Sequence, residues 1–353
     1  MTHFHLILTL DYELFGNGSG CLEHCVSRPT DACLNILKQF EAPMAFFVDA
    51  SEFRALKSYP EPFACGMAVV ESQLQAAVEQ GHKLQLHLHP QWLGANYEHG
   101  QWQLDMSKWR IGDLSSTDMQ QCVDEGLDYL REVLAGCSTD TSDHLQVFRA
   151  GGWAIQPSAK LVPILSKAGI RFESTVAPNA YNPAAGDWFD FRRCSTRPSW
   201  PIDTDVCLEG AADSARLIEV PIATAKVSKL SHYKALKENR SGPAFPSGCV
   251  GSYAGANTKS QEMLGKFSKL LRLGYVMLDF STMPGWMLID ISKRYLQKFA
   301  QADQPVPLVA IGHNKNFTEQ SQLHLRTWLQ WVADEPAISL STYQQWYSAY
   351  RGG

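Results

Sequence analysis

The amino-acid sequence predicts an α/β protein whose parallel strands close, or nearly close, into a barrel. Short apolar runs alternate with segments of helical periodicity about seven times, which is typical of a parallel sheet. Hydrophobic residues make up 45% of the 353 residues and charged residues 19%, which indicates a packed core. The chain has no internal repeat and no linker, so we expect a single domain over residues 1–353.

The first half of the chain predicts four strands, each followed by a helix. The strands are short buried or alternating runs, and the helices have apolar residues at spacings of three and four. A capping box at residues 115–118 begins the third helix, and Pro43, Gly81 and Gly169 follow the ends of the others. The strands are residues 4–10, 44–48, 83–89 and 145–149, and the helices are residues 29–40, 70–79, 115–134 and 158–168.

The same pattern continues in the second half of the chain, and two long stretches interrupt it along the whole sequence. Strands are expected at residues 170–174, 217–221, 276–280 and 307–312, and helices at residues 260–273, 286–299 and 319–332. The interruptions, residues 89–112 and 178–213, are rich in Trp, Pro, Asn and Gly. Both follow strands, on the side where barrel enzymes keep their active sites, so we expect these loops near the site.

Charge and cysteine content exclude several classes of function. The chain carries 31 Lys and Arg against 36 Asp and Glu, a net charge of −5, which argues against nucleic-acid binding. The sequence has no run of 18 apolar residues, so we expect no membrane span. The nine cysteines are scattered and no secretory signal pattern is present, so free thiols in a cytoplasmic protein are expected. No pattern specifies an oligomeric state.

Polar residues cluster at the ends of four predicted strands. Asp11 and Glu13 are two residues apart, as are His87 and His89, so each pair points to one side of an extended chain. The fourth strand ends at Arg149, and the last strand ends at His313. If these strands line one barrel, the six side chains surround one mouth.

Such a set has the groups needed for metal-assisted hydrolysis. Two imidazoles and one carboxylate can hold a divalent ion and leave positions for water and substrate. A second carboxylate can take a proton from the water, and a third histidine can protonate a leaving group. Each residue alone has a structural interpretation: a carboxylate pair can cap a turn, and Arg149 can be an ion-pair partner. The prediction depends on their coincidence at four strand ends.

Five segments, in this order, resemble motifs of the polysaccharide deacetylase family, the NodB-homology group of carbohydrate esterase family 4. They are Thr9–Glu13, Gly81–His89, Phe148–Trp153, Gly169–Thr175 and Leu308–His313. The resemblance implies a distorted (β/α)7-type, NodB-like barrel and the metal-dependent removal of an N- or O-acetyl group from a sugar.

The resemblance also implies a role for each matching residue. Asp11 would be the general base, His87 a metal ligand and His313 the general acid. Arg149 would orient Asp11 by ion pairing, and Trp153 would line the acetyl pocket.

The sequence departs from the family pattern at two positions. Tyr12 stands where the family has a second Asp, so Glu13 is the nearest substitute, and whether Asp11 or Glu13 binds the metal stays open. Gln91 stands where the family has its second histidine, so His89 is the alternative. We therefore expect Glu13, His87 and His89 to bind one divalent ion, with zinc indicated by the ligand set.

Tyr12, Trp92 and Trp153 are expected to contact the substrate. Trp92 belongs to a group of aromatic residues after His89 that either stack on sugar rings or pack the loops: Trp92, Tyr97, Trp102 and Trp109.

The expected substrate is an acetylated sugar of a surface polysaccharide or of its precursor. The lack of a signal pattern favours the precursor. Two alternatives stay open: a deformylase or amidohydrolase that acts on another C–N bond, and a non-catalytic carbohydrate-binding relative.

Overall fold

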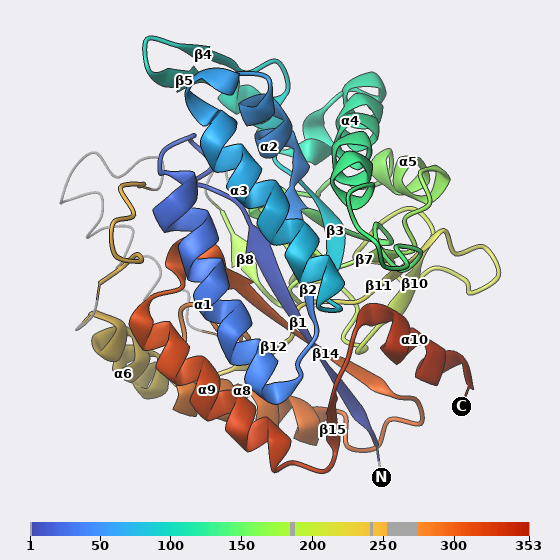
Figure 1. Cartoon of the computed structure of the whole chain (residues 1–353). Helices are drawn as coiled ribbons and strands as arrows, with labels where there is room; N and C mark the ends of the chain where they lie inside the picture. The colour runs from blue at the N-terminus through green and yellow to red at the C-terminus, as the bar shows by residue number, and fades with distance from the viewer. Residues whose placement is uncertain (1, 184–187, 241–242, 253–273, 353) are drawn as a thin grey trace.

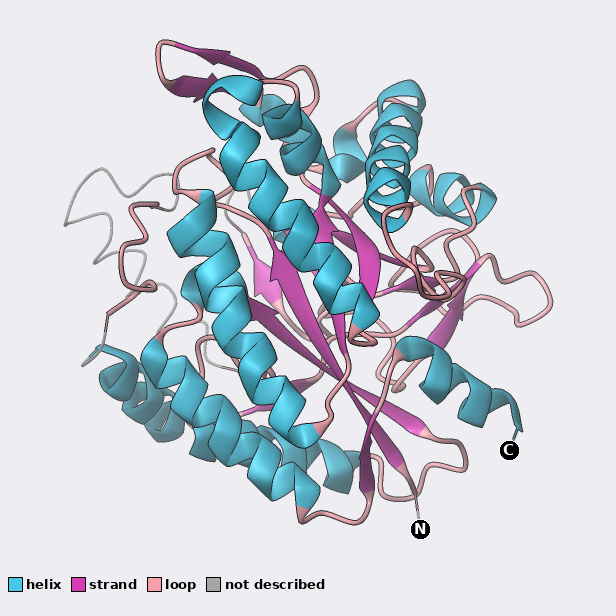
Figure 2. Ribbon diagram, viewed as in Figure 1, coloured by secondary structure: helices cyan, strands magenta, loops and turns pink. Residues whose placement is uncertain are grey.

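A single curled sheet organises the protein, as the computed structural model shows for residues 2–183, 188–240, 243–252 and 274–352 (Figures 1 and 2). The strands of this sheet are β1 (Phe4–Tyr12), β2 (Met44–Asp49), β3 (Lys83–Leu88), β6 (Val147–Ala150), β7 (Phe172–Glu173), β10 (Trp200–Ile202), β11 (Leu217–Glu219), β14 (Val306–His313) and β15 (Ile338–Leu340). Their order is β10-β11-β7-β6-β3-β2-β1-β14, with β15 paired to β1. All these pairs are parallel except β10 with β11.

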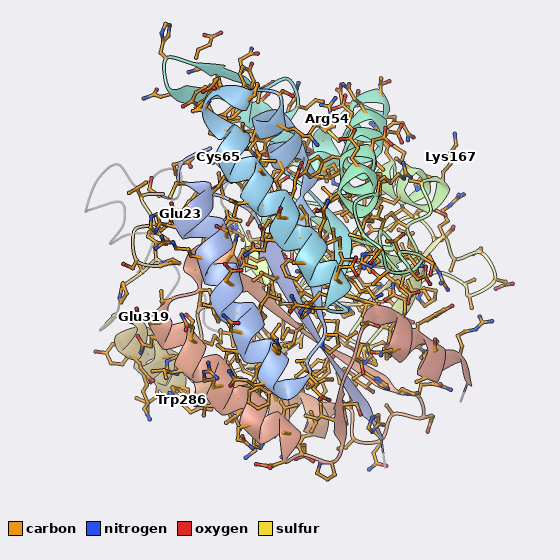
Figure 3. The ribbon with its side chains drawn as sticks, viewed as in Figure 1. Glu23, Arg54, Cys65, Lys167, Trp286 and Glu319 are labelled. Atoms are coloured by element: carbon orange, nitrogen blue, oxygen red, sulfur yellow. A yellow bond between two sulfur atoms is a disulfide. The ribbon has the colours of Figure 1, made fainter. Side chains whose placement is uncertain are left out.

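Helices cover the outer face of the sheet, as expected for strands that are buried on both faces. They are α1 (Arg28–Leu37), α2 (Ala50–Lys57), α3 (Pro60–Glu79), α4 (Ser116–Leu134), α5 (Leu161–Lys167), α6 (Lys229–Arg240), α8 (Gly285–Lys298), α9 (Glu319–Ala333) and α10 (Tyr343–Gly352). Arg54, Lys167 and Glu319 lie on the exposed sides of their helices (Figure 3). The opposite sides contribute apolar residues to the core.

The two ends of the sheet are joined by the chain that follows β11. Ile222 bridges to Val309 in β14, and the Ala223 amide donates to the Val309 carbonyl at 2.9 Å. On its other side, the Ile222 amide donates to the Val176 carbonyl at 2.8 Å. These bonds connect the chain that follows β7 and β11 to β14, and the predicted barrel fold is confirmed.

The prediction of regular elements fails where a strand or helix is short or depends on distant partners. Short antiparallel pairs were not predicted: β4 (Asn96–Glu98) with β5 (Gln101–Gln103), β8 (Tyr181–Asn182) with β9 (Phe189–Asp190), and β12 (Thr224–Lys226) with β13 (Tyr275–Met277). The strand expected at residues 276–280 is divided: its start pairs with β12, and Asp279 bridges to Ile311. The helix expected at residues 260–273 lies outside the described residues.

The expectation of free thiols is wrong for four cysteines. Disulfides join Cys25 to Cys249 and Cys194 to Cys207, whereas the other five cysteines carry none in the described chain. Widely spaced cysteines gave no pairing signal, because the barrel brings together positions 224 residues apart in sequence. Disulfides are typical of oxidising compartments, so the cysteine argument for a cytoplasmic protein fails.

None of the helices in the described ranges is long and apolar enough to cross a membrane.

Candidate active site

Strand register brings the predicted site residues together. Asp11 in β1 pairs with His313 in β14, and His87 in β3 pairs with Arg149 in β6. Parallel strands present their carboxyl ends at the same edge of the sheet, so these side chains meet at one mouth. Glu13 follows the end of β1 and lies on the same side as Asp11.

Glu13, His87 and His89 form a buried cluster with the composition of a metal site. The three ligand atoms lie within 4.8 Å of one another. Glu13 Oε2 is 3.4 Å from Nε2 of His87 and 2.8 Å from Nε2 of His89. These three atoms are buried, and they have no partners among the described residues other than one another. Buried polar atoms without partners are costly, and a divalent ion would satisfy all three at once.

A second-sphere contact prepares His87 to bind a cation. Its Nδ1 donates to the Arg149 carbonyl at 2.9 Å, since a carbonyl oxygen only accepts. In the neutral ring the lone pair therefore lies on Nε2, which faces Glu13. Burial lowers the pKa of His87, but nearby Asp11 and Glu13 outweigh this effect, so that its pKa is raised.

Lys315 is a site residue that the sequence analysis missed. Its Nζ donates to Glu13 Oε1 at 2.7 Å and to the Leu14 carbonyl at 2.6 Å. Burial raises the pKa of Glu13, but Lys315 and the two histidines more than offset this, and the pKa lies well below its usual value. Glu13 is therefore a carboxylate with one oxygen held by Lys315 and the other facing the histidines. The only signal was the position of Lys315, two residues after His313.

Asp49 is a second missed residue, at the end of β2. Its Oδ1 accepts from the backbone amides of His89 and Glu52, both at 3.3 Å. Asp49 thus fixes the chain that carries His89 while also capping α2. Burial raises the pKa of Asp49 despite the opposing influence of the histidines.

Asp11 is held by a buried arginine. Arg149 Nη1 lies 2.5 Å from Asp11 Oδ1, and the same nitrogen donates to Thr9 Oγ1 at 3.0 Å. Arg149 Nε donates to the Ser174 carbonyl at 2.9 Å, and its guanidinium lies 3.9 Å from the centre of the Phe47 ring. These contacts fix Arg149 from several directions, and through it the Asp11 carboxylate.

His313 joins Asp11 to the cluster of Glu13, His87 and His89. His313 Nε2 is 3.4 Å from Asp11 Oδ2 and 3.9 Å from Glu13 Oε1. Its ring is more exposed than those of His87 and His89. The arrangement therefore has a buried ligand set and, toward the mouth, a histidine beside a second carboxylate.

Two indole rings flank these groups. Trp153 is half-buried, with its ring centre 6.1 Å from that of His313, and Trp109 has its ring centre 5.3 Å from that of His89. Trp153 is held in a left-handed backbone conformation (φ 58°). The loop before it approaches closely, because a Cβ at Gly151 would collide with the His89 ring. Trp153 is therefore near the predicted site, and Trp109 was predicted only as one of several loop aromatics.

Two of the residues predicted to contact the substrate are buried in the structure. Tyr12 points to the opposite side of β1 from Asp11, is fully buried, and donates from its hydroxyl to Gln73 Oε1 at 2.7 Å. Trp92 is 2% exposed and packs edge-on against Trp102, with ring centres 5.0 Å apart. Tyr12 is thus part of the sheet–helix core, and Trp92 is part of the loop core.

Solved structures share this fold at low sequence identity. A protein described as a polysaccharide deacetylase from Mycobacterium smegmatis is 11% identical, with a TM-score of 0.53 over 99% of this chain and 91% of that chain. The allantoinase Puue is 10% identical, with a TM-score of 0.51 over 99% and 91%. A 4-alpha-glucanotransferase from Thermococcus litoralis is 14% identical, with a TM-score of 0.52 over 99% of this chain and 40% of that chain.

No protein-family model matches the chain, and no curated protein sequence matches it. The fold and the buried cluster define a (β/α) barrel with a candidate metal centre. Its fold is that of the polysaccharide deacetylases, so the resemblance drawn from five short segments is confirmed at the level of fold.

Proposed function

We propose that this protein is a metal-dependent hydrolase that removes an acetyl group from an N- or O-acetylated sugar. The observation that carries the proposal is the contact between two sets of residues. One set is the buried cluster of Glu13, His87 and His89. The other is the ion pair of Asp11 with Arg149 beside His313.

The ligand set fits a divalent ion, and zinc is the ion that we expect from two histidines and one carboxylate. When bound there, such an ion would polarise the acyl carbonyl and lower the pKa of a water molecule. Lys315 keeps Glu13 ionised, and the Arg149 carbonyl keeps the lone pair of His87 on Nε2. These residues therefore prepare the cluster for a cation.

Asp11 is the proposed general base. Its carboxylate takes a proton from the attacking water, while Arg149 holds Oδ1 and leaves Oδ2 on the side of His313. The water oxygen forms a bond to the acyl carbon as this proton leaves. Arg149 acts through Asp11 and is a positioning residue.

His313 is the proposed general acid. Its protonated ring gives a proton to the sugar nitrogen or oxygen as the bond to the acyl carbon breaks. The products are acetate and the free amine or hydroxyl of the sugar, and the proton held by Asp11 restores the acid. Trp153 beside His313 and Trp109 beside His89 are the residues that we propose flank the acyl group.

A second candidate is an amidohydrolase that acts on another C–N bond, such as a formamide or a small cyclic amide. The fold shared with an allantoinase favours this candidate, because the same groups can serve either reaction. A carbohydrate-binding relative without activity is less favoured, because it has no use for a base, an acid and an orienting arginine in one place.

The test is a product screen on the purified protein with added zinc. We expect acetate release from N-acetylated or O-acetylated sugars of a surface polysaccharide or its precursor, and none from the Asp11→Asn variant. Formate release from formylated sugars, or opening of a cyclic amide, would instead favour the second candidate. No product from any of these substrates, with metal bound, would contradict the proposal.

A further inference from the structure

Two of the three proposed metal ligands lie just beyond the ends of their strands. β1 ends at Tyr12, so Glu13 is the first residue after it. β3 ends at Leu88, so His89 is the first residue after it, whereas His87 lies within the strand. The regular ladder of backbone hydrogen bonds stops at a strand end. The chain at Glu13 and at His89 therefore needs other partners to hold a fixed geometry.

The first turn of α2, which follows β2, supplies such partners. In the sheet, β2 lies between β1 and β3, so its carboxyl end is next to both strand ends. Glu52 accepts from the Leu14 amide, at 3.0 Å to Oε1 and 3.2 Å to Oε2. Asp49 Oδ1 accepts from the His89 amide at 3.3 Å. The carboxyl groups of one helical turn thus hold the backbone beside both ligands.

The first turn of α4 is arranged differently. Its N-cap residue, Ser115, accepts from the Asp118 amide at 3.1 Å, and the Ser115 hydroxyl donates to Asp118 Oδ2 at 2.8 Å. The acid at the third helical position thus returns to its own cap and stabilises the helix end. In α2 the N-cap residue, Asp49, accepts from the Glu52 amide at 3.3 Å, but the Glu52 carboxyl group reaches Leu14. The acid of α2 is therefore directed at the site rather than at its own helix.

Two buried acids are a costly way to begin a helix. Asp49 is 1% exposed, and Glu52 is fully buried. Burial, Asp49 and Glu13 raise the pKa of Glu52 well above its usual value. Asp49 Oδ2 has no hydrogen-bond partner among the described residues. Since an apolar side chain of similar size could fill such a position at lower cost, the placement of both acids favours a role at the site.

We propose that Asp49 and Glu52 are positioning residues that set the geometry of Glu13 and His89 for metal binding. Glu52 fixes the peptide after Glu13, and Asp49 fixes the peptide that carries His89. Neither carboxyl group binds the ion itself. The inference rests on the proposed function for its catalytic consequence, but metal binding and its geometry can be measured without any substrate.

The test is zinc binding to metal-free protein, measured by competition with a chelator at fixed pH. Glu52→Leu keeps the approximate volume but removes the acceptor for the Leu14 amide, so we expect the zinc dissociation constant to rise about 10–100-fold. Glu52→Gln keeps an acceptor oxygen, and its dissociation constant should stay close to that of the wild type. The visible absorption spectrum of the cobalt-substituted protein reports the ligand geometry, and it should change in Glu52→Leu but not in Glu52→Gln.

Asp49→Ser separates the capping of α2 from the contact with His89. Serine is a good N-cap residue, but its hydroxyl oxygen is closer to the backbone than Oδ1 of aspartate. We expect α2 to be kept and zinc binding to weaken about tenfold. Ser115→Ala is the matched control, because Ser115 is exposed and caps α4. Its loss should reduce stability without a change in zinc affinity.

Metal positioning and catalysis can fail separately in this design. Weaker zinc binding in Glu52→Leu and Asp49→Ser but not in Glu52→Gln, with no product release by the wild type, would support the inference and contradict the proposed function. Unchanged zinc affinity and an unchanged cobalt spectrum in folded Glu52→Leu and Asp49→Ser would overturn the inference, and product release by the wild type would leave the function standing. If Glu52→Leu does not fold, Asp49→Ser is the deciding variant. No zinc binding by the wild type would overturn both.

Discussion

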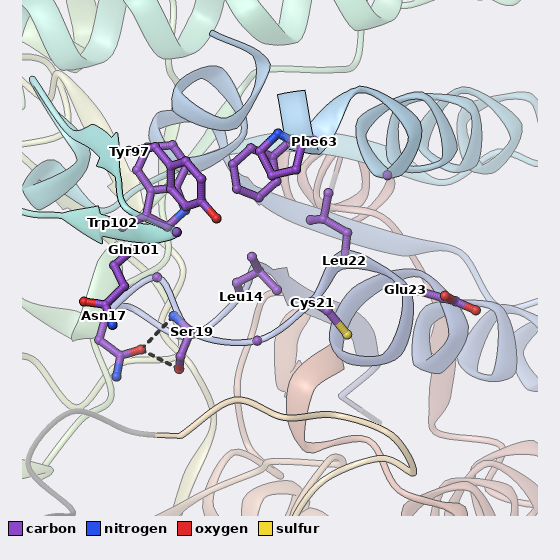
Figure 4. Close-up of a pocket in the computed structure, with 15 residues that line it drawn as sticks. Leu14, Asn17, Ser19, Cys21, Leu22, Glu23, Phe63, Tyr97, Gln101 and Trp102 are labelled. Atoms are coloured by element: carbon purple, nitrogen blue, oxygen red, sulfur yellow. Dashed lines mark hydrogen bonds between the residues drawn. The ribbon is translucent and has the colours of Figure 1, made fainter. Parts of the chain in front are cut away.

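The candidate active site and the aromatic pocket, a cavity lined by Phe63, Tyr97 and Trp102 (Figure 4), lie on two sides of one loop but are built in different ways. The site groups come from strand ends and are largely buried: Asp11, Glu13, His87, His89, Arg149 and His313. The aromatic rings of the pocket come from α3 and from the hairpin of β4 and β5, and they are partly exposed. The first region depends on strand register, and the second depends on how loops pack against one another.

The two regions also differ in where their charged groups lie. Buried ion pairs, such as Arg149 with Asp11 and Lys315 with Glu13, are costly to desolvate and are weak evidence for stability. Their concentration at the strand ends therefore favours the proposed catalytic role of these residues over a purely stabilising one. The described residues that line the pocket include no lysine, arginine or histidine. We therefore expect substitutions in the site to change turnover, and substitutions among the loop aromatics to change binding or stability.

The largest effect is expected for Asp11→Asn. The variant keeps the shape of the side chain but removes the base, so kcat should fall about 10²–10⁴-fold while metal content is kept. Steady-state kinetics and elemental analysis of the same sample measure both. Full activity with metal bound would remove Asp11 from the proposed mechanism.

His313→Gln is expected to lose much more activity on substrates whose leaving group needs a proton than on substrates whose leaving group does not. An amine needs a proton to leave, whereas an activated phenol does not, so the variant should lose about 10²-fold or more on an N-acetyl sugar. On an acetate ester of nitrophenol the loss should be much smaller. Comparison of the two kcat ratios is the measurement, and equal losses on both substrates would contradict the role of general acid.

Trp92→Ala is expected to reduce stability rather than catalysis. Trp92 is 2% exposed, and loss of a buried indole typically costs about 3–5 kcal/mol of unfolding free energy. Urea unfolding measures this loss, and kinetics at a temperature where the variant is folded should give an unchanged KM. A raised KM without loss of stability would instead support the prediction that Trp92 contacts the substrate.

The smallest effect is expected for Tyr12→Phe. The change removes the hydrogen bond to Gln73 from a buried position, so the unfolding free energy should fall by about 1 kcal/mol. The kcat and KM values should match those of the wild type, because Tyr12 lies on the other side of β1 from Asp11. A change in kcat/KM greater than about tenfold would show that the two sides are coupled.

The positions of the strand-end residues could be predicted from the sequence, because side chains alternate along a strand and parallel strands end at the same edge of a sheet. Asp11 with Glu13, and His87 with His89, could therefore be assigned to one mouth. The same alternation places Tyr12 on the opposite side of β1 from Asp11, where it is fully buried. Lys315 gave too weak a signal, because the contact with Glu13 depends on the turn after β14.

Residues that pack in loops could not be placed from the sequence. Trp92 and Trp109 look alike in the sequence, yet one is buried against Trp102 and the other lies beside His89. The Cys25–Cys249 disulfide joins positions that only the folded chain brings together. In each case no periodic pattern in the sequence marks the partner.

The most direct test of the account is the metal content of the purified protein, wild type against the His87→Ala/His89→Ala double variant. We expect about one equivalent of zinc or another divalent ion per chain in the wild type, and its loss in a folded double variant. The absence of metal from the wild type, even after zinc is added, would contradict the assignment of Glu13, His87 and His89 as a metal centre.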